Sequence, residues 1–241
     1  MMDDLNQVRG ASRDKVEAMF DSISHRYDLL NRLLSLGTDK RWRRRAVNVI
    51  GKHVRASKIL DVATGTGDLA IEALRLNPDQ ITGIDISEKM LAAGLEKIDR
   101  QGYKEKIRLI KGDSEKILFP DHYFDVVMSA FGVRNFENTV TGLREMLRVI
   151  RPGGMIMVLE FSRPSWFPLR QLYGFYFTRI LPWIGRKVSG DPDAYSYLPD
   201  SVMAFPDNED FLALLRNVGF AGERQLKLSG GIASIYYGFR P

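Results

Sequence analysis

Two acidic residues flank a short glycine-rich stretch, in an arrangement that could hold a nucleoside. Gly65 and Gly67 follow an apolar segment that contains Asp61, and a second apolar segment further along ends in Asp85. Glycines can adopt positive φ angles and expose bare backbone to a ligand, and a helix beginning behind them offers free N–H groups. A carboxylate at Asp85 can accept hydrogen bonds from two ribose hydroxyls. The stretch 58–85 therefore predicts a nucleoside site.

The elements that must position these residues form a strand–loop–helix–strand unit. Residues 58–62 are apolar enough for a buried parallel strand, and apolar residues then recur at helical spacing until Asn77-Pro78 stops the helix. Residues 81–84 predict the second strand. This unit is half of a mononucleotide-binding, doubly wound α/β fold.

The glycine pattern leaves two cofactors open. The sequence GTGDLA (65–70) also fits the G-x-G-x-x-G/A pattern of NAD-binding proteins. Asp61 argues against a dinucleotide, because its carboxylate would repel a pyrophosphate but attract the ammonium and sulfonium of S-adenosylmethionine. We therefore favour S-adenosylmethionine. A purely structural Asp61, bonded to loop amides, stays open as the alternative.

The composition limits what the 241-residue chain can do. With 44% hydrophobic and 27% charged residues, it can form one large domain with a substantial core. The lack of cysteine excludes disulfides, thiolate zinc sites and the attacking thiolate of cytosine C5 methylation, and no metal site is expected. Neither a signal peptide nor a run of about 18 apolar residues is visible, so we expect a cytoplasmic protein.

Much of the net charge of +5 lies around one tryptophan. Lys40, Arg41 and Arg43–Arg45 flank Trp42 in a helix predicted at 39–52, whose apolar residues face inward and whose arginines face solvent. The simplest interpretation is a solvated helix face. Contact with anionic lipid is the second interpretation, and nucleic-acid binding is the third.

The N-terminal part of the chain holds a second group of polar residues. A helix is predicted from residue 14, and the segment after it mixes apolar residues with His25, Tyr27 and Asp28. Such a density of polar side chains suits a lid over a site, although a capping and packing segment would also explain it. We interpret residues 14–52 as an N-terminal helical lid.

Further elements extend the central unit into one sheet. Ser87 predicts the N-cap of a helix, and Asp113 follows a third strand, where it could accept a hydrogen bond from adenine. A fourth strand leads to residues 130–135 at the carboxyl end of the sheet, where ligands bind in this fold class. These predicted elements, which complete a cofactor-binding core at 57–161, span residues 88–100, 107–110, 124–128, 137–150 and 155–161. A tight turn is predicted at 151–154, before the last of them.

The last part of the chain adds an insertion and a C-terminal unit. Aromatic residues are dense at 163–187, which predicts a helical lid or the wall of an apolar substrate channel that touches a membrane surface. Residues 191–198 predict a polar, aromatic loop. We interpret 162–206 as a lid and substrate insertion, and 207–241 as a helix that ends at Gly219, followed by a hairpin.

Five motifs in order resemble the bacterial menaquinone/ubiquinone-biosynthesis C-methyltransferases. They are FDSISHRYDLLNRLLSLGTDKRWRR, ILDVATGTGDLA, FGVRNF, RPGGMIMVLEFSRP and DAYSYLPDSV, within residues 18–239. The resemblance implies one class I methyltransferase domain over 1–241, with a Rossmann-like, doubly wound seven-strand sheet, N-terminal helices and an inserted helical lid. It also implies S-adenosyl-L-methionine as cofactor and C-methylation of a prenylated quinol ring. Demethylmenaquinol is the favoured substrate, and a ubiquinone-pathway benzoquinol or another small molecule is the alternative.

The resemblance also assigns residues to the cofactor. Family contacts fall on Thr66, Asp85, Asp113 and Ser114, and a position that is serine in relatives is Ala130 here. Together with the glycine loop, the expected cofactor site comprises Asp61, Gly65, Thr66, Gly67, Asp85, Asp113, Ser114 and Ala130.

C-methylation requires a ring carbon made nucleophilic by loss of a hydroxyl proton. The site therefore needs a base or proton relay and a cation near the phenolate. The candidates for the base or relay are His25, Tyr27, Asp28 and Tyr195, and we favour Arg134 as the cation.

Rival enzyme classes fit less well. Nucleic-acid amine methylases have an Asn/Asp-Pro-Pro-aromatic motif after the fourth strand, and residues 130–135 do not contain it. An NAD-dependent oxidoreductase would bind NADH in place of the methyl donor. We therefore expect a prenylated quinol substrate, no nucleic acid, and transient peripheral contact with the inner face of the cytoplasmic membrane. A homodimer stays open.

Overall fold

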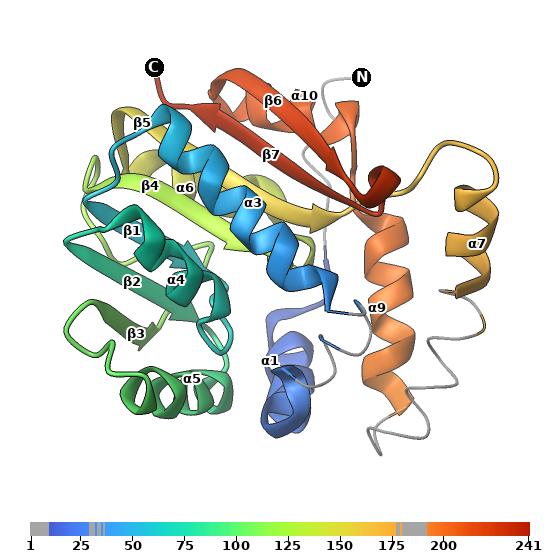
Figure 1. Cartoon of the computed structure of the whole chain (residues 1–241), viewed down its shortest axis with the longest axis horizontal. Coiled ribbons are helices and arrows are strands. Elements are labelled where there is room, and N and C mark those ends of the chain that lie inside the picture. Colours follow the sequence, from blue (N-terminus) through green and yellow to red (C-terminus); the bar gives the residue numbers. More distant parts are fainter. Residues whose placement is uncertain (1–9, 29–31, 33–34, 36, 177–178, 180–191) are drawn as a thin grey trace.

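A seven-stranded sheet forms the centre of the molecule, in the order β3-β2-β1-β4-β5-β7-β6 (Figure 1). β1 to β5 are parallel, and β7 and β6 add an antiparallel hairpin at one side. The strands are β1 Lys58–Val62, β2 Gln80–Asp85, β3 Ile107–Lys111, β4 Phe124–Ala130, β5 Ile150–Phe161, β6 Ala221–Leu228 and β7 Ala233–Phe239. This computed structural model describes residues 10–28, 32, 35, 37–176, 179 and 192–241, with only the backbone for 26, 192–196 and 198.

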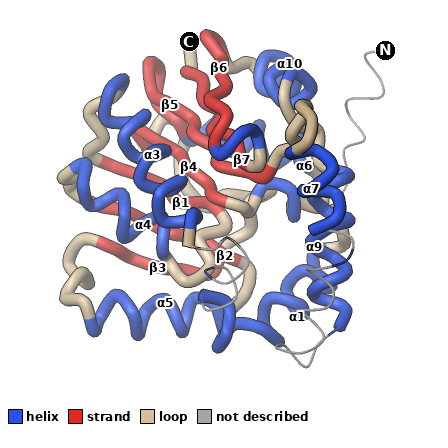
Figure 2. The backbone as a smooth tube through the Cα atoms, turned by 45° about the vertical axis from the view of Figure 1, so that its right-hand side comes forward, coloured by secondary structure: helices blue, strands red, loops and turns tan. Residues whose placement is uncertain are grey.

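Helices cover both faces of the sheet and create two apolar layers (Figure 2). One face packs against α3 Thr38–His53, α4 Asp68–Ala73 and α5 Glu88–Arg100, and the other against α6 Thr139–Val149 and α10 Glu209–Val218. The central strands are buried on both sides, which explains why their sequences are continuous apolar runs without alternation. The predicted doubly wound α/β fold is confirmed.

Three more helices lie beyond the carboxyl ends of the parallel strands (Figure 1). They are α1 Arg13–Ile23, α7 Leu169–Phe175 and α9 Pro192–Ala204. Short 3-10 turns are η2 Ser24–Arg26, η3 Leu74–Leu76, η4 Val133–Asn135 and η6 Ser229–Gly231. These three helices therefore stand at the edge where ligands bind in such folds.

The predicted helix ends agree with the structure. Ser87 caps α5, since its Oγ accepts a hydrogen bond from Met90 N at 3.1 Å, and α10 stops at Gly219, whose φ is 118°. The fifth strand starts earlier than expected, because Ile150 already pairs with Phe124 before the register shifts. The predicted turn at 151–154 is therefore part of an irregular strand.

The expectation of a loop at 191–198 is wrong, because α9 begins at Pro192. Proline suits the first turn of a helix, where its missing N–H would have no partner in any case. The buried Val202 of α9 packs with Tyr173 of α7. This apolar contact packs the C-terminal half of α9 against α7.

The expectation that all arginines of α3 face solvent is also wrong for one of them. Trp42, Ala46, Val49 and Ile50 are buried as predicted. Arg43 is buried with them, because Asp39 and Asp68 both form ion pairs with its guanidinium. The other basic residues of the row, which are Lys40, Arg41, Arg44 and Arg45, are exposed.

Candidate active site

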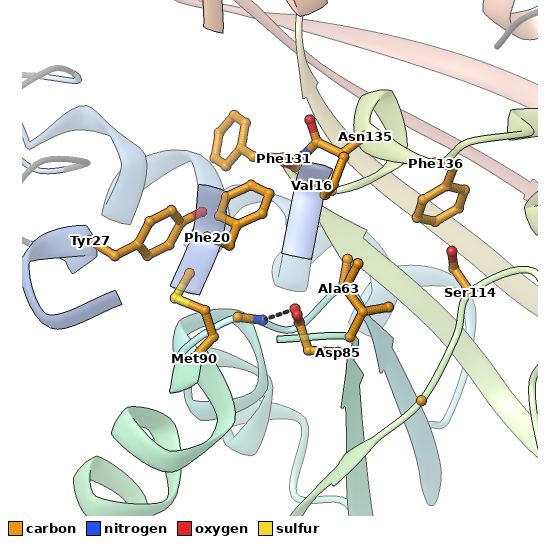
Figure 3. A pocket seen from close by; sticks show the side chains of 14 residues that line it. Val16, Phe20, Tyr27, Ala63, Asp85, Met90, Ser114, Phe131, Asn135 and Phe136 are labelled. Carbon is orange, nitrogen blue, oxygen red and sulfur yellow. Dashed lines mark hydrogen bonds between the residues drawn. The ribbon is translucent and has the colours of Figure 1, made fainter. Parts of the chain in front are cut away.

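A pocket lies at the carboxyl ends of the parallel strands, beneath α1 (Figure 3). One wall is backbone and acid, and the opposite wall is apolar and comes from the N-terminal segment. Its lining residues are Val16, Phe20, Tyr27, Ala63, Gly65, Asp85, Ile86, Met90, Gly112, Ser114, Phe131, Gly132, Asn135 and Phe136. A pocket with large apolar faces and one carboxylate suits an adenosine.

The glycine loop forms the floor of this pocket. Gly65 has a φ of 56°, and a Cβ there would lie 3.8 Å from Cε1 of Tyr27. Gly67 has a φ of 80° and is the N-cap residue of α4. It lies next to the side chains of Ile98 and Leu109 and does not line the pocket. The two glycines thus have different roles: Gly65 exposes backbone to the pocket, and Gly67 allows the tight entry into the helix.

Asp85 lies at the end of β2 and faces the pocket (Figure 3). Its Oδ2 accepts a hydrogen bond from Gly65 N at 2.8 Å, and its Oδ1 accepts one from Ser87 N at 3.0 Å. Burial raises the pKa of this carboxyl, while the two amides oppose that rise. Each oxygen keeps a second lone pair for a ligand hydroxyl.

Asp61 lies below the loop and does not line the pocket. It is 1% exposed, and its Oδ2 accepts a hydrogen bond from Thr64 Oγ1 at 2.7 Å. Its Oδ1 has no hydrogen-bond partner among the described residues. Burial raises its pKa from 3.8 to about 7. The carboxyl therefore titrates near neutral pH when no cation is close.

Thr66 points away from the pocket and into a chain of charged groups. Its hydroxyl donates to Asp28 Oδ1 at 2.7 Å and contacts Lys97 Nζ at 2.9 Å. The ammonium of Lys97 also forms an ion pair with Asp68 Oδ1 at 2.8 Å, and Asp68 forms a second ion pair with Arg43. Burial alone would raise the pKa of Asp68, but the two cations hold it below its usual value.

Of the two adjacent residues predicted beside the adenine, one lines the pocket and the other does not. Ser114 lines the pocket, whereas Asp113 forms an ion pair with Arg13 Nη1 of α1 at 2.8 Å. Ala130 is half-buried at the end of β4 and is not part of the lining. The adjacent Ser129 is fully buried, and its Oγ has no partner among the described residues.

Arg134 belongs to a buried ion pair. Its Nη1 lies 3.2 Å from both carboxylate oxygens of Glu160 on β5, and it also donates to Phe131 O. Its Nε has no hydrogen-bond partner within the described part of the chain. Burial raises the pKa of Glu160, while the charge of Arg134 opposes the rise. The cation is thus present but partly neutralised.

A second pocket adjoins the first on the side of Arg134. Tyr197 of α9 lines this pocket, and its hydroxyl donates to Asn135 Oδ1 at 3.1 Å. Asn135 in turn lines the first pocket. Residues of the η4 turn therefore line both pockets.

Comparison with known proteins decides the class of this site. The sequence profile of the ubiE/COQ5 methyltransferase family matches residues 8–240. The chain belongs to this family. The demethylmenaquinone methyltransferase of Bacteroides fragilis is 43% identical over 228 residues, which cover 94% of this chain and 93% of the relative. The ubiquinone/menaquinone biosynthesis C-methyltransferase UbiE of Geobacter sulfurreducens is 47% identical over 227 residues, which cover 93% and 88%.

Solved structures agree on the fold of this methyltransferase family member. The cyclase SpnF superimposes with a TM-score of 0.68 at 16% identity and covers 97% of both chains. A SAM-dependent methyltransferase from Aquifex aeolicus gives a TM-score of 0.63 at 18% identity and covers 89% of this chain and 98% of its own. Identities this low support the fold alone, since one fold hosts several chemistries.

The four predicted base candidates are dispersed in this methyltransferase. Tyr27 lines the first pocket, with its ring 5.9 Å from that of Phe20. Asp28 pairs with Lys97, and His25 is exposed. Tyr195 belongs to α9, but the structure describes only its backbone.

Sequence reasoning missed Lys97 and Glu160 as parts of the site. Lys97 is one of several lysines on a helix, and nothing in its spacing marks it as buried. Glu160 lies one residue before the end of a long apolar strand, as Asp61 does, and Asp85 is the last residue of its strand. An acid at the end of a buried strand is the signal that could have found it.

Proposed function

We propose that the protein transfers the methyl group of S-adenosylmethionine to a ring carbon of a prenylated quinol, with demethylmenaquinol as the favoured substrate. The observation that supports this most strongly is the family match over residues 8–240. The names of the two relatives support the reaction, and one of them also includes the ubiquinone pathway. A benzoquinol is therefore the alternative substrate.

The pocket offers contacts for each part of the donor. Asp85 would accept hydrogen bonds from the ribose hydroxyls, and Ile86 and Ser114 would flank the adenine. The bare backbone at Gly65 would lie under the sugar and the methionine chain. When bound, S-adenosylmethionine supplies an electrophilic methyl group on its sulfonium. Val16 and Phe20 of α1 would keep water from that side of the pocket.

The residues for the acceptor ring lie at η4, next to the donor pocket. We place the quinol ring near Arg134 and Tyr197, which line the second pocket, where the guanidinium charge would stabilise a phenolate oxygen. Tyr27 is the base candidate whose side chain lines the donor pocket. Since methyl transfer is an in-line displacement, holding ring carbon and methyl group in line is the main task of these walls.

An anaerobic assay tests the proposed function. Purified protein, S-adenosylmethionine and dithionite-reduced demethylmenaquinone should give a product one methyl group heavier by mass spectrometry. A reduced benzoquinol precursor is assayed in parallel, and NADH binding is measured by calorimetry. Failure to methylate either quinol, together with tight NADH binding, would favour an oxidoreductase and overturn the proposal.

Asp85→Ala should weaken binding of the donor about tenfold to a hundredfold, because a charge-assisted contact to the ribose is lost. Calorimetry measures the affinity, and chemical denaturation measures the unfolding free energy. Asp79→Ala is the matched control, since Asp79 is an exposed acid next to the other end of β2. Equal donor affinities for the wild type and Asp85→Ala would remove the ribose role.

Asp61 should make both stability and donor binding depend on pH. Its pKa in the ligand-free protein is about 7, against 3.8 for an ordinary aspartate. The folded state therefore binds the extra proton between these values, and stability falls as pH rises through that window. A pKa shift of this size corresponds to a change of at most about 4 kcal/mol in the free energy of unfolding.

Asp61→Asn should remove this pH dependence from both properties. Between pH 6 and 8, donor affinity should rise in the wild type as the carboxylate forms near the cationic donor, and it should stay level in the variant. Unfolding and calorimetry at several pH values provide the comparison. Parallel curves for the two proteins would show that Asp61 does not titrate in this range.

We propose that the exposed basic residues of α3 make transient contact with an anionic membrane surface. No helix in the described residues is long and apolar enough to span a bilayer. Exposed Lys40, Arg41, Arg44 and Arg45 offer about 1 kcal/mol each near an anionic surface. Exposed Trp166, Phe167 and Phe175 add apolar anchors.

Arg41→Ser/Arg45→Ser should lower the fraction of protein that floats with anionic vesicles at low salt by roughly an order of magnitude, since about 2 kcal/mol is lost. Lys89→Ser/Arg100→Ser on α5 removes the same charge elsewhere and should change little. If both double variants float like the wild type, the α3 row is only a solvated face.

A further inference from the structure

A row of polar contacts fixes α1 to the core. The contacts recur every four residues, so they lie along one side of the helix. They join Arg13 to Asp113 (2.8 Å), Glu17 to Lys111 (3.1 Å) and Asp21 Oδ1 to Ser87 Oγ (2.6 Å). Val16 and Phe20, on the neighbouring side, line the donor pocket. The position of α1 thus sets the apolar wall of that pocket.

Lys97 makes a further set of polar contacts beyond α1, which is less exposed than these and joins more than two segments of the chain. Lys97 of α5 is 11% exposed, and its Nζ lies 2.5 Å from Asp28 Oδ2, 2.8 Å from Asp68 Oδ1 and 2.9 Å from Thr66 Oγ1. An ammonium has three N–H donors, so these acceptors use all of them. Lys111, in contrast, is 52% exposed and pairs with two carboxylates at the surface.

The acceptors of Lys97 belong to both walls of the donor pocket. Asp28 is the neighbour of Tyr27, whose ring lines the pocket from the lid. Thr66 follows Gly65, whose backbone lines it from the floor. The Asp28 carboxylate also accepts from Thr66 Oγ1 at 2.7 Å, so lid and floor meet at this ammonium. Removing the charge would loosen the two walls together.

We propose that Lys97 is a positioning residue for the methyl donor: it joins the lid to the glycine loop and so sets the width of the pocket between Tyr27 and Gly65. This inference rests on the proposed function, because it takes the occupant to be S-adenosylmethionine. Lys97 does not touch the donor pocket itself and acts through Asp28 and Thr66.

The test compares Lys97→Met, which keeps the apolar stem, with Lys97→Arg and with Lys104→Met, which removes an exposed ion pair at 2.7 Å to Asp99, a residue on the same helix as Lys97. Lys97→Met should raise the KM and Kd for S-adenosylmethionine about tenfold to a hundredfold, the size of a lost set of charge-assisted hydrogen bonds. The kcat at saturating donor should fall much less. Lys97→Arg should recover part of the affinity, and Lys104→Met should bind like the wild type.

A second variant keeps the proposal testable if Lys97→Met folds poorly. Asp28→Asn retains an acceptor for Thr66 but removes the charge that pairs with Lys97. It should weaken donor binding to a similar degree, and the double variant Asp28→Asn/Lys97→Met should be no weaker than the poorer single variant.

The outcomes separate this inference from the proposed function. If the wild type fails to bind S-adenosylmethionine in calorimetry, both are overturned. If the wild type binds and Lys97→Met binds equally well while its Tm falls, the proposed function stands and Lys97 is only a structural ion pair. Strict additivity of Asp28→Asn and Lys97→Met would also overturn the positioning role.

Discussion

Arg134→Met is expected to lower kcat about a hundredfold to a thousandfold with little change in donor affinity, because the guanidinium matters most as phenolate charge develops. It should also lower the free energy of unfolding by about 3–5 kcal/mol, since Glu160 is left buried and unpaired. The Arg134 side chain is 7% exposed and that of Glu160 is 0%. Steady-state kinetics and chemical denaturation measure the two effects.

A double variant separates catalysis from folding. Arg134→Met/Glu160→Gln buries no charge, and the glutamine oxygen can still accept from the backbone N–H of Phe161, which now bonds Glu160 at 3.0 Å. Most of the lost stability should return. If Arg134 acts on the phenolate, kcat should stay low. Recovery of kcat together with stability would limit the ion pair to a structural role.

With the oxidised quinone in place of the quinol, we expect no turnover above background. A quinone ring carbon is electron-poor, and the ring has no hydroxyl to ionise, so it cannot attack a sulfonium methyl. In the quinol, loss of one proton pushes electron density onto the ring carbon, and a cation beside the oxygen stabilises that state. The effect therefore follows from the substrate's redox state and needs no change in the protein.

The assay uses one substrate sample in both redox states. Demethylmenaquinone is mixed anaerobically with enzyme and S-adenosylmethionine, first without and then with dithionite, and methylated product is quantified by mass spectrometry. Turnover should start on reduction and stop when air is admitted. Equal rates before and after reduction would rule out the phenolate mechanism and leave Arg134 without its proposed role.

The fold could be predicted from the sequence because the signals for its parts are local. Continuous apolar runs marked the central strands, Ser87 marked the start of α5, and Gly219 marked the end of α10. The segment 191–198 was mistaken for a loop, because Pro192 signals both a turn and a first helical residue. The same helix packs Val202 against Tyr173 of α7, a contact between residues distant in sequence.

The site could be predicted only where position along a strand determines exposure. Asp85 and Gly65 were found because the end of β2 and the glycine loop face the pocket in this fold class. The burial of Arg43, Lys97 and Glu160 could not be read from their types, since charged residues are normally solvated. Each is buried because a partner from another element compensates its charge.

The two outer strands of the sheet bear on self-association. β3 and β6 have no neighbour on their outer side within the described sheet. Exposed cations stand on both, namely Arg108 and Lys111 on β3 and Arg224 and Lys227 on β6. Like charges on open edges oppose pairing between molecules, which is a common protection against aggregation. These charges therefore make extension of one sheet into the next less favourable than contact between copies through helices or loops.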